Sequence, residues 1–135
     1  MKHSKKILVI DDFAPARDYL KFLLEKEDYL VEVAVNGVEG LARFDTGGLF
    51  DAVITDIAMP EKDGIETLIE LKKRDPRLKV IVVSGAESSE RLLGIAGMFR
   101  ADATIAKPFT QQALALALKE VFSKSVPIKE PALPV

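Results

Sequence analysis

The sequence contains no cysteine among its 135 residues, which excludes disulfide bonds and any chemistry that depends on a thiolate. It also lacks a basic excess, since 19 Lys and Arg stand against 21 Asp and Glu and the formal net charge is −2. A domain with this charge is not an obvious nucleic-acid binder. The first apolar run covers only 7–10, too short for the core of a signal peptide or for a membrane span. We therefore expect a cytoplasmic protein with no direct contact to nucleic acid or membrane.

The apolar residues that are present follow two alternating patterns. Short runs rich in β-branched residues predict strands, and the longer segments between them have the periodicity of helices. The predicted strands cover 7–10, 30–35, 51–55, 79–84 and 103–106, and the predicted helices cover 15–27, 37–48, 65–76, 89–100 and 110–122. Five strands alternating with five helices imply right-handed βαβ crossovers, and hence an α/β fold with a doubly wound parallel sheet.

The runs differ in ways that predict their place in the sheet. Residues 7–10 and 79–83 are apolar throughout, which is typical of central parallel strands, whereas the run 30–35 contains Glu32 and suits an edge. The last segment, 123–135, has three prolines and no apolar period. We expect one domain over 1–122, followed by a Pro-rich flexible tail or the start of a linker.

Polar residues follow four of the five predicted strands. Asp11 and Asp12 come after the first strand and Asp56 after the third, while Ser84 ends the fourth and Lys107 follows the fifth. In an open parallel sheet, ligands bind beyond the carboxyl ends of the strands, where the strand order reverses. The sequence therefore predicts that three carboxylates, a hydroxyl and an amine gather at one edge of the sheet.

The charges of this group indicate its chemistry. Three neighbouring carboxylates repel one another, and a hard divalent cation with oxygen ligands such as Mg²⁺ relieves the repulsion. Lys107 adds a positive charge suited to an incoming phosphoryl group, and Ser84 offers a hydroxyl to one of its oxygens. One carboxylate is then left to act as a nucleophile and form an aspartyl phosphate.

Four segments, in this order and spacing, resemble the response-regulator receiver domains of two-component signalling, in particular the single-domain, chemotaxis-regulator-like members. The segments are "ILVIDD", "DAVITDIAMPEKDG", "VIVVSG" and "IAKPF", and the resemblance runs from Lys5 to Phe122. It implies a flavodoxin-like fold with five helices and the strand order 2-1-3-4-5. The family is not one of turnover enzymes, because a receiver catalyses only its own phosphorylation and dephosphorylation.

The resemblance also implies a role for each residue of the predicted metal site. Asp56 would accept the phosphoryl group, and Asp12 would bind Mg²⁺ directly with Asp11 assisting through water. The backbone carbonyl of Ala58 would be a further metal ligand.

The remaining positions of the motif would handle the phosphoryl group. Ser84 would be the switch hydroxyl. Lys107 would be the phosphoryl-binding lysine, held by a cis peptide bond to Pro108.

The sequence departs from the family pattern at two positions. Thr104 stands where receivers usually have a Tyr or Phe that rotates on activation, so we expect coupling through Ser84 and the loop that follows it. Arg100 stands where the family usually has a glycine before the fifth strand.

The resemblance implies partners on both sides of the reaction. The only histidine, His3, lies in the N-terminal segment, so the phosphoryl donor would be a histidine kinase or a histidine phosphotransfer protein. The output protein is unknown and would bind near the fourth and fifth helices, with the receiver a monomer or a phosphorylation-dependent dimer. Kinase docking near Pro15, Arg17 and Asp18 is one interpretation of the start of the first helix, and a solvated helix face is the other.

Three alternatives remain at this point. The chain could be a receiver excised from a longer DNA-binding or enzymatic response regulator, or a receiver that binds a partner without being phosphorylated. It could also be a Mg²⁺-dependent aspartyl-phosphate phosphatase of the haloacid-dehalogenase type. That class requires Asp-x-Asp after the first strand, whereas this chain has Asp11 and Asp12 followed by Phe13.

Overall fold

The structure is a computed structural model, and it describes residues 4–57, 64–85 and 89–124, without the side chains of 89–93. Five strands alternate with five helices. In chain order they are β1 (Lys6–Ile10), α1 (Ala14–Lys26), β2 (Leu30–Ala34), α2 (Gly37–Thr46), β3 (Ala52–Asp56), α3 (Gly64–Arg74), β4 (Lys79–Ser84), α4 (Ser89–Met98), β5 (Ala103–Ala106) and α5 (Gln111–Ser123). The sheet is parallel and has the order β2-β1-β3-β4-β5, which confirms the predicted flavodoxin-like fold.

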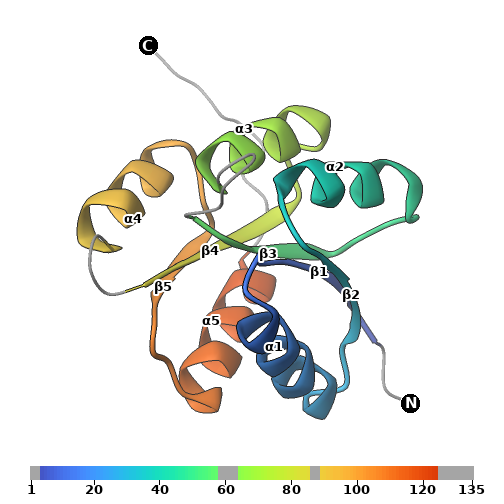
Figure 1. The fold of residues 1–135 in the computed structure, drawn as a ribbon, viewed down its shortest axis with the longest axis vertical. Helices are drawn as coiled ribbons and strands as arrows, with labels where there is room; N and C mark the ends of the chain where they lie inside the picture. Colours follow the sequence, from blue (N-terminus) through green and yellow to red (C-terminus); the bar gives the residue numbers. More distant parts are fainter. Residues whose placement is uncertain (1–3, 58–63, 86–88, 125–135) are drawn as a thin grey trace.

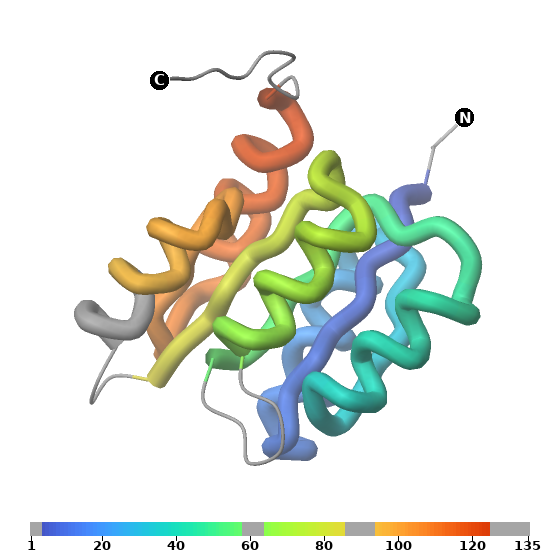
Figure 2. The backbone as a smooth tube through the Cα atoms, turned by 90° about the horizontal axis from the view of Figure 1, so that it is seen from above, coloured from blue at the N-terminus to red at the C-terminus, as the bar shows by residue number. Residues whose placement is uncertain are grey.

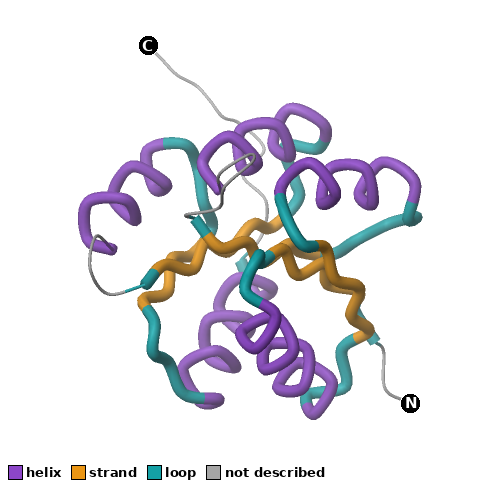
Figure 3. The backbone as a smooth tube through the Cα atoms, viewed as in Figure 1, coloured by secondary structure: helices purple, strands orange, loops and turns teal. Residues whose placement is uncertain are grey.

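Helices cover both faces of the sheet. Helices α1 and α5 lie on one face and α2, α3 and α4 on the other (Figures 1 and 3). Successive residues of β1 serve the two faces alternately: Ile7 and Val9 belong to the core under α1 and α5, and Leu8 and Ile10 to the opposite core. Because both faces are buried, the central strands must be apolar at every position, as the runs in the sequence are.

The edge strand β2 ends one residue earlier than predicted, because the N–H of Val35 is hydrogen-bonded to the N-terminal cap of α2 and not to the sheet. The side chain of Asn36 accepts a hydrogen bond from the backbone N–H of Glu39 (2.8 Å), and Glu39 in turn accepts one from the N–H of Val35 (2.7 Å). This reciprocal arrangement begins α2. Thr110 caps α5 in a similar way, accepting from the N–H of Ala113 at 3.0 Å.

The turn between α4 and β5 contains an arginine in an unusual backbone conformation. Arg100 has φ +76°, and its N–H donates to the carbonyl of Gly97 while the N–H of Ala101 donates to that of Ala96. These two bonds form a Schellman-type helix end, in which glycine normally occupies the left-handed position. The departure from the family pattern noted at Arg100 therefore falls at a position where a side chain is strained.

The strands share one direction, so their carboxyl ends meet at one edge of the sheet. In Figure 2 the carboxyl ends of β1, β3 and β4 all lie along the lower edge of the view. The opposite edge contains a shallow hollow of about 380 Å³, lined on its sides by Lys5, Tyr29, Lys119 and Phe122 among others. Within the described ranges, no helix combines the length and the apolar character that crossing a bilayer requires.

Candidate functional site

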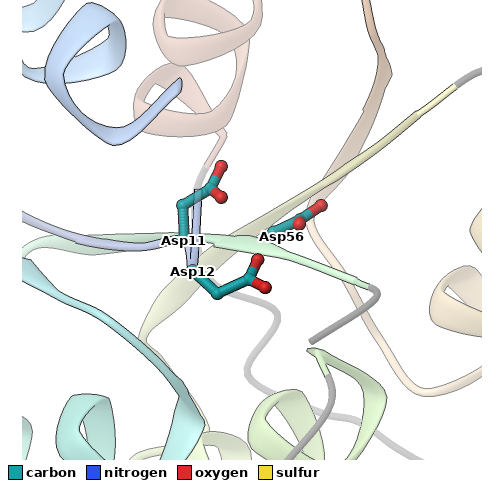
Figure 4. Close-up of side chains that lie close together, drawn as sticks. All are labelled: Asp11, Asp12 and Asp56. Atoms are coloured by element: carbon teal, nitrogen blue, oxygen red, sulfur yellow. The ribbon is translucent and has the colours of Figure 1, made fainter. Parts of the chain in front are cut away.

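Three carboxylates lie together at the carboxyl edge of the sheet. Asp11, Asp12 and Asp56 each offer an oxygen atom within 4.8 Å of the others, although they come from two strands and their following turns (Figure 4). Asp11 and Asp56 are buried and Asp12 is exposed. The strand order places β1 directly beside β3, which brings residues 45 positions apart into one cluster.

Asp11 is held by four polar contacts. Its N–H donates to the carbonyl of Ala34 (3.2 Å), and its carbonyl accepts from Nη1 of Arg17 (2.8 Å). Of its carboxylate oxygens, Oδ1 accepts from the N–H of Phe13 (2.9 Å) and Oδ2 from Nζ of Lys107 (3.3 Å). With 1 % of its surface exposed, Asp11 is held in a fixed position inside the site.

Asp56 is the last residue of β3, whereas the sequence predicted that the strand ends at residue 55. The strand continues by one residue because Asp56 pairs with Val83 of β4. The N–H of Ile57 donates both to Oδ1 of Asp56 (3.0 Å) and to the carbonyl of Val83 (2.9 Å). The carbonyl of Asp56 accepts a hydrogen bond from the buried hydroxyl of Thr55. Backbone and side chain of Asp56 are therefore both anchored, which fixes the direction of its carboxylate.

The lysine and the serine lie at the ends of the neighbouring strands. Nζ of Lys107 is 3.7 Å from Oδ1 of Asp56 and 3.3 Å from Oδ2 of Asp11, so it bridges the two buried carboxylates. The N–H of Lys107 donates to the carbonyl of Ser84 at 2.7 Å, and the Ser84 hydroxyl makes a longer contact of 3.4 Å with the Gly85 carbonyl. The peptide bond between Lys107 and Pro108 is cis, as the resemblance implies.

The electrostatics of the site act on Asp56 most strongly. Burial and the negative charge of Asp11 raise the pKa of Asp56 to about 6, with a smaller upward contribution from Asp12. The Lys107 ammonium and the Ile57 N–H act in the opposite direction. The single charge of Lys107 does not balance the negative charge of three carboxylates. The charged form of Asp56 is therefore disfavoured until a further cation enters the site.

The donor set suits a small hard cation. Each of the three acids offers a carboxylate oxygen, and the exposure of Asp12 leaves a way in from solvent. Carboxylate oxygens with room for water molecules are the coordination that Mg²⁺ prefers in proteins. The three acids are clustered as in Mg²⁺-binding receivers.

Of the residues predicted from sequence, the structure brings together Asp11, Asp12, Asp56 and Lys107, with Ser84 on the adjoining strand end. Ala58, expected to supply a metal-binding carbonyl, lies outside the described residues. Thr104 is exposed on β5 and pairs with Val82.

Three neighbours of the site were missed or differently interpreted. Thr55 was not singled out, although a hydroxyl in an otherwise apolar strand is a usable signal. Gly64, the last residue of the second segment that carries the resemblance, is a steric requirement of the site, because a Cβ there would lie 2.5 Å from Cα of Ile57 and still closer to the Asp56 carbonyl oxygen. Arg17 was interpreted either as part of a kinase-docking surface or as part of a solvated helix face, whereas its guanidinium is hydrogen-bonded to the backbone of the site.

A family comparison agrees with this geometry. The model of the response regulator receiver domain matches residues 7–119, so the chain belongs to the response regulator receiver family. Receiver domains take part in two-component signalling and interact with histidine kinases, and they are not classical enzymes.

The curated relatives with similar sequences are longer proteins. The chain is 32% identical to the transcriptional regulatory protein ResD of Bacillus subtilis over 127 residues and to a CpxR homologue of Haemophilus influenzae over 120 residues. It aligns over 91% and 89% of its own length, but spans only about half the length of these curated relatives, 50% and 51%.

Solved structures of isolated receivers match over nearly their whole length. A CheY-like receiver from Methanospirillum hungatei is 36% identical with a TM-score of 0.80, covering 87% of this chain and 93% of that one. The response regulator TrrA of Thermotoga maritima, solved in complex with Mg²⁺ and BeF, is 32% identical with a TM-score of 0.78, covering 87% and 98%.

Proposed function

We propose that this domain is a phosphoacceptor: it takes a phosphoryl group from a histidine kinase or a histidine phosphotransfer protein onto Asp56. The observation that carries the proposal is the Asp11–Asp12–Asp56 cluster, with Lys107 in contact with two of its members. An Oδ atom of Asp56 attacks the phosphorus, the P–N bond to the donor imidazole breaks, and its electron pair returns to the imidazole nitrogen.

The other residues take supporting roles in this proposal. Asp12 and Asp56 would hold Mg²⁺ with Asp11 assisting, and the ion would supply charge neutralisation for the transferring phosphoryl group. Lys107 moves from its carboxylate contacts to a phosphoryl oxygen, and Ser84 donates its hydroxyl to another. The backbone carbonyl of Ala58 is proposed as a further ligand of the ion.

The output follows from the added charge of about −2 at Asp56. Drawing Ser84 and Lys107 toward the phosphoryl group biases the adjoining loops, and with them the surface of α4 and α5, toward a downstream partner. Exposed apolar side chains on these helices, Met98 (79% exposed) and Leu116 (59% exposed), support a binding role for this surface. We propose residues 1–122 as the receiver domain. The segment 123–135 is proposed as its tail or as the start of a linker.

The experiment is intact mass spectrometry after incubation with acetyl phosphate, with and without Mg²⁺. We expect a single Mg²⁺-dependent phosphoryl adduct on the wild type that hydroxylamine removes and that Asp56→Asn does not form. If neither acetyl phosphate nor a panel of histidine kinases and phosphotransfer proteins phosphorylates the wild type, the proposal is wrong and a binding-only receiver takes its place.

A further inference from the structure

Arg17 reaches back from the beginning of α1 to the backbone of the acidic cluster. Its Nη1 donates to the carbonyl oxygen of Asp11 at 2.8 Å, across six positions of the chain, and the side chain is half-buried. That carbonyl lies one residue beyond the end of β1, where sheet pairing no longer supplies a donor. The guanidinium therefore replaces the missing sheet hydrogen bond.

The peptide that Arg17 contacts joins Asp11 to Asp12. Asp11 is fixed on its other sides by Ala34, Phe13 and Lys107. Among the residues that the structure describes, no hydrogen bond or ion pair holds the carboxylate of the exposed Asp12. The direction of the Asp12 side chain toward the cluster, seen in Figure 4, consequently depends on the orientation of the backbone from which it starts.

We propose that Arg17 is a positioning residue for the metal site: by clamping the Asp11 carbonyl it fixes the Asp11–Asp12 peptide and thereby aims the Asp12 carboxylate at Mg²⁺. This inference rests on the proposed function, because it concerns the same acidic site. Outer partners that orient metal ligands typically change metal affinity by 10–100-fold when they are removed.

The sign of the effect separates positioning from simple charge. Arg17 is a cation beside a site for another cation, so Coulomb repulsion alone predicts that its removal tightens Mg²⁺ binding. Positioning predicts the reverse, because Asp12 loses its fixed direction.

The test compares two substitutions that each remove one positive charge from α1 and leave a methionine. Arg17→Met removes the clamp, whereas Lys21→Met is a matched control, because Lys21 is paired with Glu25 at the surface. We expect Arg17→Met to weaken Mg²⁺ binding about tenfold by calorimetric titration. Lys21→Met should leave it within about twofold, and Arg17→Lys, which keeps a donor and the charge, should restore most of the loss.

A second readout follows the hydrogen bond itself. The amide ¹⁵N shift of Asp12 reports on the hydrogen bond to the preceding carbonyl, and we expect it to move in Arg17→Met but not in Lys21→Met. If Arg17→Met does not fold, Arg17→Gln takes its place, with an expected weakening of a few fold.

The outcomes are distinguishable. Two results together would overturn this inference alone: the Arg17 variants bind Mg²⁺ at least as tightly as the wild type does, and Asp12→Asn abolishes Mg²⁺ binding. A wild type without saturable Mg²⁺ binding, or an Asp12→Asn variant that binds normally, overturns the proposed metal site and this inference together.

Discussion

At the scale of single residues, the environment of Asp56 disfavours its charged form in the absence of metal. Asp56 is 9% exposed, and its carboxylate lies beside that of Asp11. A pKa raised from 3.8 to about 6 means that the folded state holds this proton more tightly than the unfolded state does. The folded protein is therefore destabilised as the pH rises through this range, until Asp56 is ionised in both states.

Asp56→Asn removes that penalty, and we expect it to stabilise the metal-free protein at pH 8. The difference between the folded and unfolded pKa values sets an upper limit of about 3 kcal/mol, so we expect about 1–3 kcal/mol at pH 8 and about 0.5 kcal/mol or less at pH 4. Urea denaturation of both proteins in the presence of a chelator measures the gap. A gap of equal size at both pH values would show that the ionisation of Asp56 is not its cause.

Arg100 is a second residue whose local conformation opposes its side chain. The left-handed conformation costs a residue with a Cβ about 1–2 kcal/mol, and glycine avoids this cost. Glycine loses more conformational entropy on folding than arginine does, but this loss costs less than the strain that is relieved. We expect Arg100→Gly to stabilise the domain by about 0.5–1 kcal/mol, measured by thermal and urea unfolding. Arg77→Gly, at an exposed turn position without positive φ, serves as the control and should destabilise. A loss of stability in Arg100→Gly would mean that the arginine side chain makes a compensating contact.

At the scale of elements, the start of α3 depends on one close approach to the end of β3. The N–H of Gly64 donates to the carbonyl of Ile57 at 2.8 Å, and the Gly64 Cα faces the Asp56 carbonyl without room for a Cβ. Helix α3 can therefore lie directly behind the acidic site only with glycine as its first residue. This is a steric demand outside the left-handed region of φ, different in kind from the strain at Arg100.

Two Gly→Ala substitutions test this demand within the same fold. Gly64→Ala should push α3 away from β3, and we expect a loss of about 2–4 kcal/mol in the free energy of unfolding together with weaker phosphorylation of Asp56. Gly94→Ala in α4 meets no atom within 4 Å, so it should stabilise by about 0.5–1 kcal/mol through helix propensity. Similar effects of the two substitutions on unfolding would contradict the steric argument.

Elements were predictable where one local pattern determines them. Within the described residues, the five strands and five helices follow from apolar periodicity, and the caps at Asn36 and Thr110 use side chains common at helix starts. The ends shifted by a residue or two where other contacts decide. The local hydrogen bond from the Val35 N–H to Glu39 ends β2 early, and the tertiary pairing of Asp56 with β4 extends β3.

At the scale of the whole molecule, the site exists because the strand order brings separate segments together. Its acids come from the ends of β1 and β3, its serine from β4 and its lysine from the turn after β5. The residue types and the shared edge were predictable, since parallel strands end on the same side. The Arg17 clamp was not, because it depends on a side-chain direction that no periodicity encodes.

Mg²⁺ should stabilise the entire fold, because the complete site forms only when all of these strands are in place. At a free concentration 100 times the Kd, we expect the free energy of unfolding to rise by about 2.7 kcal/mol. Thermal unfolding across a Mg²⁺ series measures this rise. Asp12→Asn should respond much less, and an equal response would mean that the ion acts elsewhere on the protein.

The two described ends of the chain lie close together at the edge of the sheet opposite the acidic site. Nζ of Lys5 is 5.0 Å from the ring centre of Phe122, and both residues line the shallow hollow there. A five-residue strand separates that edge from the site by about 17 Å. A protein attached at either described end would therefore start from the edge of the sheet opposite the site and leave the approach of the proposed phosphoryl donor open, which favours fusion, insertion or circular permutation of this receiver at that edge.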